Sequence, residues 1–75
     1  MRKYRNRAAS GVQEYEIGEG WIEIRFDNEP YSYLYTNESA GNYNIQQMQL
    51  LAQMGRGLAT FINKYVRKKY ASKSR

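Results

Sequence analysis

Apolar and polar residues alternate with period two along residues 11–37, and this alternation constrains the fold more than any other feature of the chain. Such a pattern places successive side chains on opposite faces of a β-strand. It predicts strands at about residues 13–17 and 21–27, followed by a third at residues 31–36. A Gly-Glu-Gly sequence joins the first two strands and an Asp-Asn-Glu-Pro sequence precedes the third, and both are typical of turns. The three strands therefore form an antiparallel meander.

The apolar period changes to 3.6 residues after a loop rich in Asn, Ser and Gly at residues 37–44. One helix is expected to begin at Ile45, with Asn44 as its N-cap, and to end at the Gly-Arg-Gly sequence of residues 55–57. A second helix follows from Leu58. We therefore predict an α+β fold of order β-β-β-α-α, a three-stranded antiparallel meander followed by two helices packed on one face. The predicted core residues are Ile22, Ile24, Phe26, Leu34, Leu51, Phe61, Ile62 and Val66.

Three tyrosines, Tyr31, Tyr33 and Tyr35, occupy alternate positions of the third predicted strand. The more apolar side of the sheet, which is expected to meet the helices, carries Ile17, Ile22, Ile24, Phe26 and Leu34. Parity then places the three tyrosines on the opposite face with Trp21, and Tyr33 is expected to be the most buried of them. A change of register by one residue would reverse this assignment. Two interpretations stay open, a scaffold of cross-strand aromatic pairs and a binding surface. The candidate aromatic binding face consists of Trp21, Tyr31, Tyr33 and Tyr35.

The formal net charge of +5 results from 12 Lys and Arg residues against 7 Asp and Glu residues, and the two signs are separated along the chain. The cations gather at both ends, whereas the middle of the chain is acidic. We predict a flexible basic arm at residues 1–10, a single α+β domain at residues 11–70 and a flexible tail at residues 71–75. Tyrosines lie among the cations at both ends, which is typical of contact with phosphates and bases; simple solvation of the charges is the alternative. The candidate nucleic-acid-binding residues are Arg2, Lys3, Arg5, Arg7, Arg25, Lys64, Arg67, Lys68 and Lys69.

The chain contains neither histidine nor cysteine, and histidine is both the commonest general base and the commonest metal ligand. Its carboxylates follow no ligand spacing, so we expect no catalytic residue, no metal site, no cofactor and no small-molecule substrate. No apolar run approaches the roughly 20 residues of a membrane span, and the basic N-terminus lacks the apolar segment of a signal peptide. We therefore expect a non-enzymatic protein of the cytoplasm with no membrane partner.

The order of strands, Tyr-x-Tyr sequence, helix, glycine, helix and late tyrosine resembles the KTSC domain, a short bacterial module found alone and at the C-terminus of some lysyl-tRNA synthetases. The resemblance covers roughly residues 13–70. Residues that stand in comparable places are Tyr31-Ser-Tyr33 or Tyr33-Leu-Tyr35, Gly55 or Gly57, Ile62 and Tyr70. The chain departs from the pattern in lacking the Val-Pro after Tyr-x-Tyr and in having a longer loop. The resemblance implies a domain without established function for which RNA binding has been suggested.

These observations together predict a small binding module that contacts nucleic acid, RNA in particular, through its basic ends and its aromatic sheet face. The alternative is a protein-binding module, such as a small regulator or inhibitor of a larger complex. That module would use the same Tyr and Trp face, because aromatic residues are enriched in protein interfaces and neighbouring acids are tolerated there.

Overall fold

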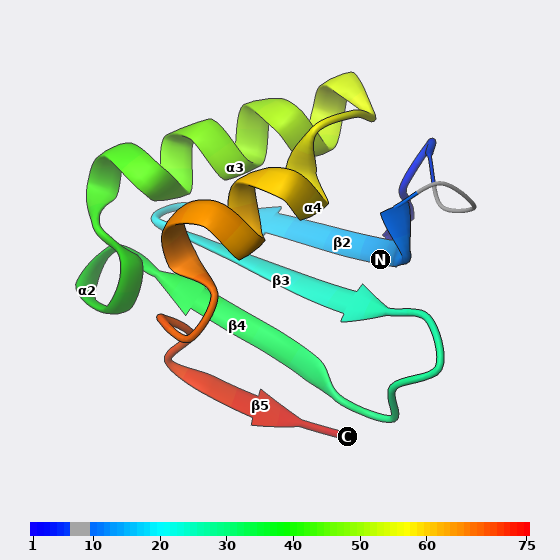
Figure 1. Ribbon diagram of the computed structural model, residues 1–75. Helices are drawn as coiled ribbons and strands as arrows, with labels where there is room; N and C mark the ends of the chain where they lie inside the picture. The colour runs from blue at the N-terminus through cyan, green and yellow to red at the C-terminus, as the bar shows by residue number, and fades with distance from the viewer. Residues whose placement is uncertain (7–9) are drawn as a thin grey trace.

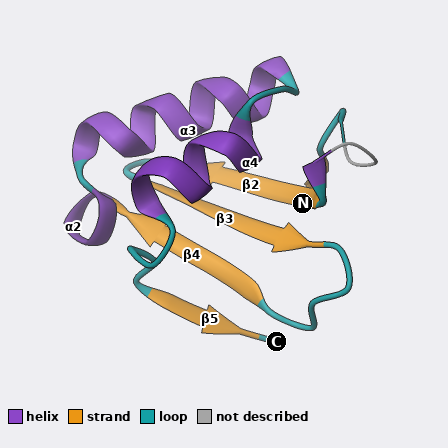
Figure 2. Cartoon of the chain, in the orientation of Figure 1, coloured by secondary structure: helices purple, strands orange, loops and turns teal. Residues whose placement is uncertain are grey.

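The computed structural model describes residues 1–6 and 10–75. The fold is built on an antiparallel sheet of five strands in the order β1-β2-β3-β4-β5. The strands are β1 (Arg2–Lys3), β2 (Val12–Gly18), β3 (Trp21–Phe26), β4 (Ser32–Thr36) and β5 (Ser72–Ser74). The helical segments are α2 (Asn37–Ala40), α3 (Asn42–Met54), α4 (Leu58–Phe61) and the π-helical η1 (Ile62–Val66). Helices α3 and α4 lie over one face of the sheet, and the described residues place no helix on the other (Figure 1). The α+β class is thus confirmed (Figure 2). The sheet has two more strands than predicted.

The central meander of β2, β3 and β4 follows the predicted positions closely. Glu19 and Gly20 form the turn between β2 and β3, and Gly20 has a φ of 78°, a conformation that glycine adopts without strain. Between β3 and β4 the chain reverses through a loop in which Asn28 also has positive φ. Local sequence therefore specifies the two hairpins.

The pairing of β3 with β4 places the tyrosines on the helix-covered face, so the predicted parity was wrong. Ile22 lies opposite Tyr35 and Ile24 lies opposite Tyr33, and directly opposite residues share a face of a sheet. Leu34 lies opposite Glu23 and therefore faces away from the helices. Aromatic rings bury more area than a single leucine, which is the physical reason that the tyrosine side is preferred. Tyr35, not Tyr33, is the most buried, at 2% exposure.

The helices begin and end partly where the sequence predicts. A capping box formed by Thr36 and Ser39 starts the short helix α2 inside the predicted loop. Helix α3 begins three residues before the predicted start, and the Asn44 side chain donates to the Ala40 carbonyl at 2.8 Å. The predicted break is confirmed, because Gly55 ends α3 in a left-handed conformation with a φ of 76°. No helix among the described residues has the length and apolarity needed to cross a bilayer.

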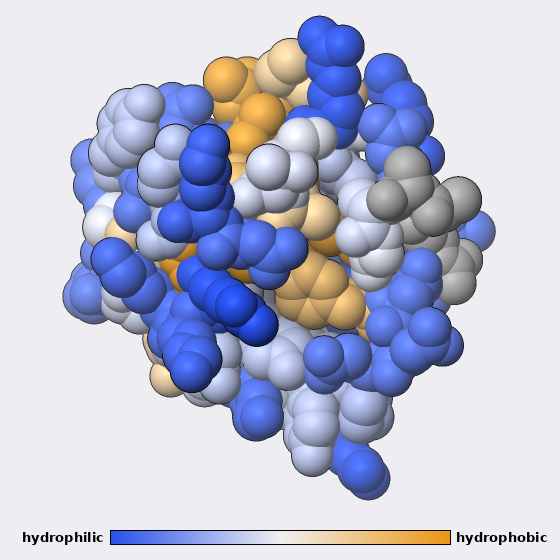
Figure 3. All heavy atoms as spheres, viewed as in Figure 1, coloured by the Kyte–Doolittle hydropathy of each residue, from blue (hydrophilic) through white to orange (hydrophobic). Residues whose placement is uncertain are grey.

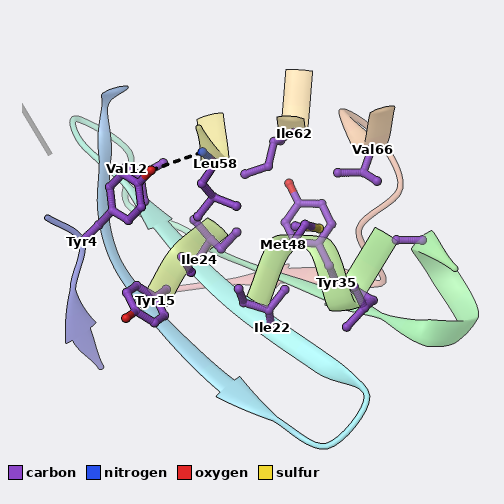
Figure 4. Packing of buried hydrophobic residues seen from close by; sticks show 13 residues of the cluster. Tyr4, Val12, Tyr15, Ile22, Ile24, Tyr35, Met48, Leu58, Ile62 and Val66 are labelled. Carbon is purple, nitrogen blue, oxygen red and sulfur yellow. Dashed lines mark hydrogen bonds between the residues drawn. The ribbon is translucent and has the colours of Figure 1, made fainter. Parts of the chain in front are cut away.

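The core lies between the sheet and the helices (Figure 4). Four predicted members are buried there, namely Ile22, Ile24, Ile62 and Val66. Three others, Phe26, Leu51 and Phe61, are only partly buried and pack against the cluster. The remaining one, Leu34, lies on the open face of the sheet, as described above. Further buried residues, which the predicted core did not contain, are Tyr4, Val12, Tyr15, Tyr35, Ala40, Ile45, Met48, Ala52 and Leu58.

The two end segments, for which a flexible arm and tail are predicted, each include a short strand at an edge of the sheet. Strand β1 pairs with β2, and β5 pairs with β4 with Ser74 opposite Ser32. Tyr4 is 2% exposed, and its hydroxyl accepts a hydrogen bond from the Leu58 backbone N–H at 3.2 Å. An edge strand supplies unpaired backbone donors and acceptors, which explains how such short segments become ordered. Residues 7–9 of the predicted arm lie outside the described residues.

Candidate nucleic-acid interface

A cleft of about 470 Å³ opens between η1 and the sheet. Its lining includes four aromatic residues, contributed by β3, β4 and the segment after η1, namely Phe26, Tyr33, Tyr35 and Tyr70. Two exposed cations, Arg67 and Lys68, line it as well. In the view of Figure 3, hydrophobic atoms are visible near the centre and at the top of the molecule, with hydrophilic atoms over most of the rest. The cleft therefore combines an aromatic interior with positive charge at its edge.

The aromatic rings of the cleft form a continuous edge-to-face series. Ring centroids are 5.6 Å apart for Phe26 and Tyr33, 5.0 Å for Tyr33 and Tyr70, and 6.2 Å for Tyr35 and Tyr70. The interplanar angles lie between 73° and 86°. Edge-to-face contacts stabilise such clusters beyond simple burial, so the rings hold one another in place. The cleft consequently has a firm aromatic wall before any ligand enters.

Two tyrosine hydroxyls in the cleft differ in their surroundings. The Tyr33 hydroxyl donates to Glu29 Oε1 at 2.9 Å, and this bond, followed by burial, raises the pKa of Tyr33. Burial raises the pKa of Tyr35 to about 12, with smaller contributions from Tyr33 and Tyr70. The Tyr35 hydroxyl points between Ile62 and Val66 (Figure 4) and has no hydrogen-bond partner among the described residues. Both groups are therefore neutral at physiological pH and able to bond a ligand.

The other C-terminal cations do not belong to the lining of the cleft. Lys64 is exposed on η1, and Lys69 is exposed three residues after the end of η1. Beyond them, β5 carries Lys73, whose Nζ lies 4.9 Å from the centroid of the Tyr31 ring. The Arg75 guanidinium carbon lies 5.8 Å from the same centroid. Cations over aromatic faces are attracted to the ring, so Tyr31 helps to hold the last residues of the chain beside β4. Neither Lys73 nor Arg75 was a predicted site residue, although both belong to the C-terminal run of cations.

The N-terminal cations lie elsewhere. Arg2 and Lys3 form β1, at the opposite edge of the sheet from β5. Arg5 packs against the glycine that ends α3, since a Cβ added to Gly55 would lie 2.6 Å from the Arg5 Cβ. Arg7 lies outside the described residues. The two basic ends therefore do not meet at one site.

Trp21 and Arg25 lie on the open face of the sheet, away from the cleft. Arg25 is paired with Glu14 at 3.6 Å. The Trp21 ring lies over Gly18, where an added Cβ would clash with the indole ring. The predicted aromatic face is thus divided, because Trp21 is separated by the sheet from Tyr33 and Tyr35.

Phe26 and Tyr70 are the aromatic residues of the cleft that the sequence prediction of the site missed. Tyr70 follows directly on the cations at residues 67–69, and that position is a signal that could have identified it. Phe26 carried no such signal, since its pattern indicates only a residue of the helix-covered face. The described residues contain no group of carboxylates that could hold a metal ion.

Comparisons with models of protein families, with curated proteins and with solved structures find no match to this chain. The resemblance to the KTSC domain therefore stays a prediction.

Proposed function

We propose that the protein binds single-stranded nucleic acid, RNA in particular, by taking an unpaired base into the cleft and holding the adjacent phosphates on Arg67 and Lys68. The observation that supports this proposal is the joint lining of one concave site by aromatic rings and cations. Proteins bind single strands by this combination, because rings contact the faces of bases and cations contact the phosphates. The volume of the cleft falls within the range of small-molecule sites, and a single base is a ligand of that size.

The carboxylates in the lining fit a base better than a phosphate. Asp27 and Glu29 both line the cleft, and a carboxylate accepts hydrogen bonds from the exocyclic amino group of a base. Phosphates would be repelled by them and drawn to Arg67 and Lys68. We therefore expect tighter binding of oligoadenylate and oligocytidylate, which carry such amino groups, than of oligouridylate.

The test measures binding of a fluorescent RNA oligonucleotide by anisotropy over a series of salt concentrations. Replacing Arg67 and Lys68 by Gln should lower the slope of log K against log salt by about 0.7 for each lost phosphate contact. The matched control replaces Arg2 and Lys3 by Gln, which removes the same charge at the far edge of the sheet and should leave the slope nearly unchanged. Equal effects of the two pairs would argue for diffuse attraction instead of a site at the cleft.

A third variant separates contact with the base from contact with phosphate. Tyr70→Ala should weaken binding by about 1–3 kcal/mol, the usual contribution of one base–aromatic contact, with little change in the salt slope. Undetectable binding of RNA and DNA even at low salt would contradict the proposal and favour the alternative of a protein partner.

A further inference from the structure

Helix α3 is unusual in its composition, because none of its residues is charged although 25% of the residues in the chain are. It runs along the outside of the molecule, with the sheet beneath it and α4 beside it (Figure 1). Its buried residues are Ile45, Met48 and Ala52, so the opposite side faces solvent. Exposed sides of such helices are normally charged or polar. The outer side of α3 carries exposed Asn and Gln residues, and the exposed apolar residues among them require an explanation.

Apolar side chains on this outer side follow a regular spacing. Tyr43, Leu50 and Met54 are 70%, 50% and 41% exposed. Together with the half-buried Gln47 they are separated by four, three and four residues, which is the spacing of a coiled-coil seam. We call these four residues the outer stripe. At a rise of 1.5 Å per residue the outer stripe is about 17 Å long, which is three helical turns.

We propose that the outer stripe is the interface between two copies of this chain, packed as an antiparallel helix pair about a two-fold axis. In a two-fold interface the same patch meets itself, so a charged patch would repel its copy. The C-terminal surface, on which Lys64, Arg67, Lys68 and Lys69 are exposed, would do so. The outer side of α3 is neutral, and it can therefore pair with itself.

The antiparallel direction follows from the identity of the end residues. It places Tyr43 against Met54 of the second copy, and a thioether beside an aromatic ring is a favourable contact. It also brings the two Gln47 side chains near the axis, where a polar residue in an apolar seam sets the register. A parallel pair would oppose like residues and like helix ends instead.

The length of the outer stripe limits the strength of the dimer. Stable interfaces bury about 800 Å² for each partner, and a pair of three-turn helices buries less. We therefore expect dissociation in the micromolar range or above. The lining of the cleft includes no residue of α3, so each copy keeps its cleft. This proposal does not depend on the ligand of that cleft.

Sedimentation of the full chain over concentrations from about 1 μM to about 1 mM tests the proposal. The mass should rise with concentration from the 8.9 kDa of one chain towards twice that value. Leu50→Lys should stay monomeric, whereas Thr60→Lys, which adds the same charge at an exposed position of α4, should dimerise like the unmodified chain. A monomer at every concentration, or equal loss of dimer in both variants, would overturn the proposal. Far-UV circular dichroism verifies that both variants fold.

Disulfide cross-linking tests the direction of the helices, since the chain has no cysteine of its own. Tyr43→Cys and Met54→Cys chains are mixed and oxidised, and a disulfide needs Cα atoms about 4.4–6.8 Å apart. The antiparallel pair predicts severalfold more of the mixed disulfide than of either symmetric one. Predominance of the symmetric products would show a parallel pair, and a lack of any cross-link would exclude this interface.

Discussion

Tyr35 belongs to both the core and the cleft. Its ring is 2% exposed beneath the helices, while its hydroxyl has no partner among the described residues and the residue lines the cleft. The ring of a tyrosine at this position fills the core between the sheet and the helices, and its hydroxyl offers one polar group to a ligand in the cleft. Phenylalanine would place the same ring in the core and leave the cleft without that group.

Burial of Tyr35 predicts a loss of stability at high pH. Its pKa is raised to about 12 in the folded chain, against about 10 in an unfolded one. The neutral form is thus favoured by folding, so the stabilisation is complete below pH 10 and lost as the pH rises through 12. The free energy of unfolding should fall by about 2–3 kcal/mol over that interval. Urea unfolding at pH 9 to 12 measures it.

The control for this prediction is Tyr35→Phe, which keeps the ring and lacks the titrating group. Because lysines also titrate in this range, only the difference between the two chains is attributed to Tyr35. An equal decline in both chains would mean that the Tyr35 hydroxyl is not responsible.

At the scale of elements, the N-terminal segment acts as part of the fold. Tyr4 packs edge-to-face on Tyr15, with 6.5 Å between their ring centroids. Its hydroxyl also accepts from the N–H of Leu58, the first residue of α4. The first N–H groups of a helix have no partner within the helix, so Tyr4 supplies one from 54 residues away. The segment therefore ties β1 to the start of α4.

Tyr4→Phe should lower the free energy of unfolding by about 1–3 kcal/mol, because it leaves the buried Leu58 N–H without an acceptor. Tyr4→Ala should cost more, about 3–5 kcal/mol, through loss of the ring. Thermal and urea unfolding measure both effects, with Arg2→Gln in the same segment as the control. If neither tyrosine substitution changed stability, residues 1–10 would behave as the flexible arm that their charge suggests.

At the scale of the whole molecule, a sheet and the helical segments over one of its faces enclose a small core. A chain of this size buries only about 60% of its unfolded surface. Leu58 is fully buried in that core, whereas Phe61 is partly exposed and packs on Tyr65 at 4.9 Å between centroids. The apolar pattern of the sequence predicted Phe61, and not Leu58, as a core residue. The chain continues from Phe61 into the π-helical segment η1, whose buried residues are Ile62 and Val66.

Leu58→Ala should therefore cost about 2–5 kcal/mol, a large part of the 5–15 kcal/mol expected for a small domain. Phe61→Ala should cost clearly less, because its side chain already contacts solvent. Urea unfolding compares the two variants. A larger loss of stability for Phe61→Ala would show that Phe61 is more deeply buried than Leu58.

Local pattern was sufficient for several elements of this protein. The period-two alternation identified β2, β3 and β4, and the glycines at 55 and 57 located the helix break. These features depend on neighbours in sequence, namely side-chain alternation and the conformational freedom of glycine. The class of fold follows from them.

Tertiary structure decided the face of the tyrosines, the two edge strands and the cleft. Parity within β4 relates Tyr33 to Tyr35 but does not say which of the two faces the helices cover. That depends on pairing with Ile22 and Ile24 in β3, where buried aromatic area outweighs one leucine. Segments as short as β1 and β5 carry no periodic signal, since the edges of β2 and β4 supply the backbone partners that order them. The cleft joins Phe26 to Tyr70 across 44 positions of the sequence, and only packing brings such distant residues together.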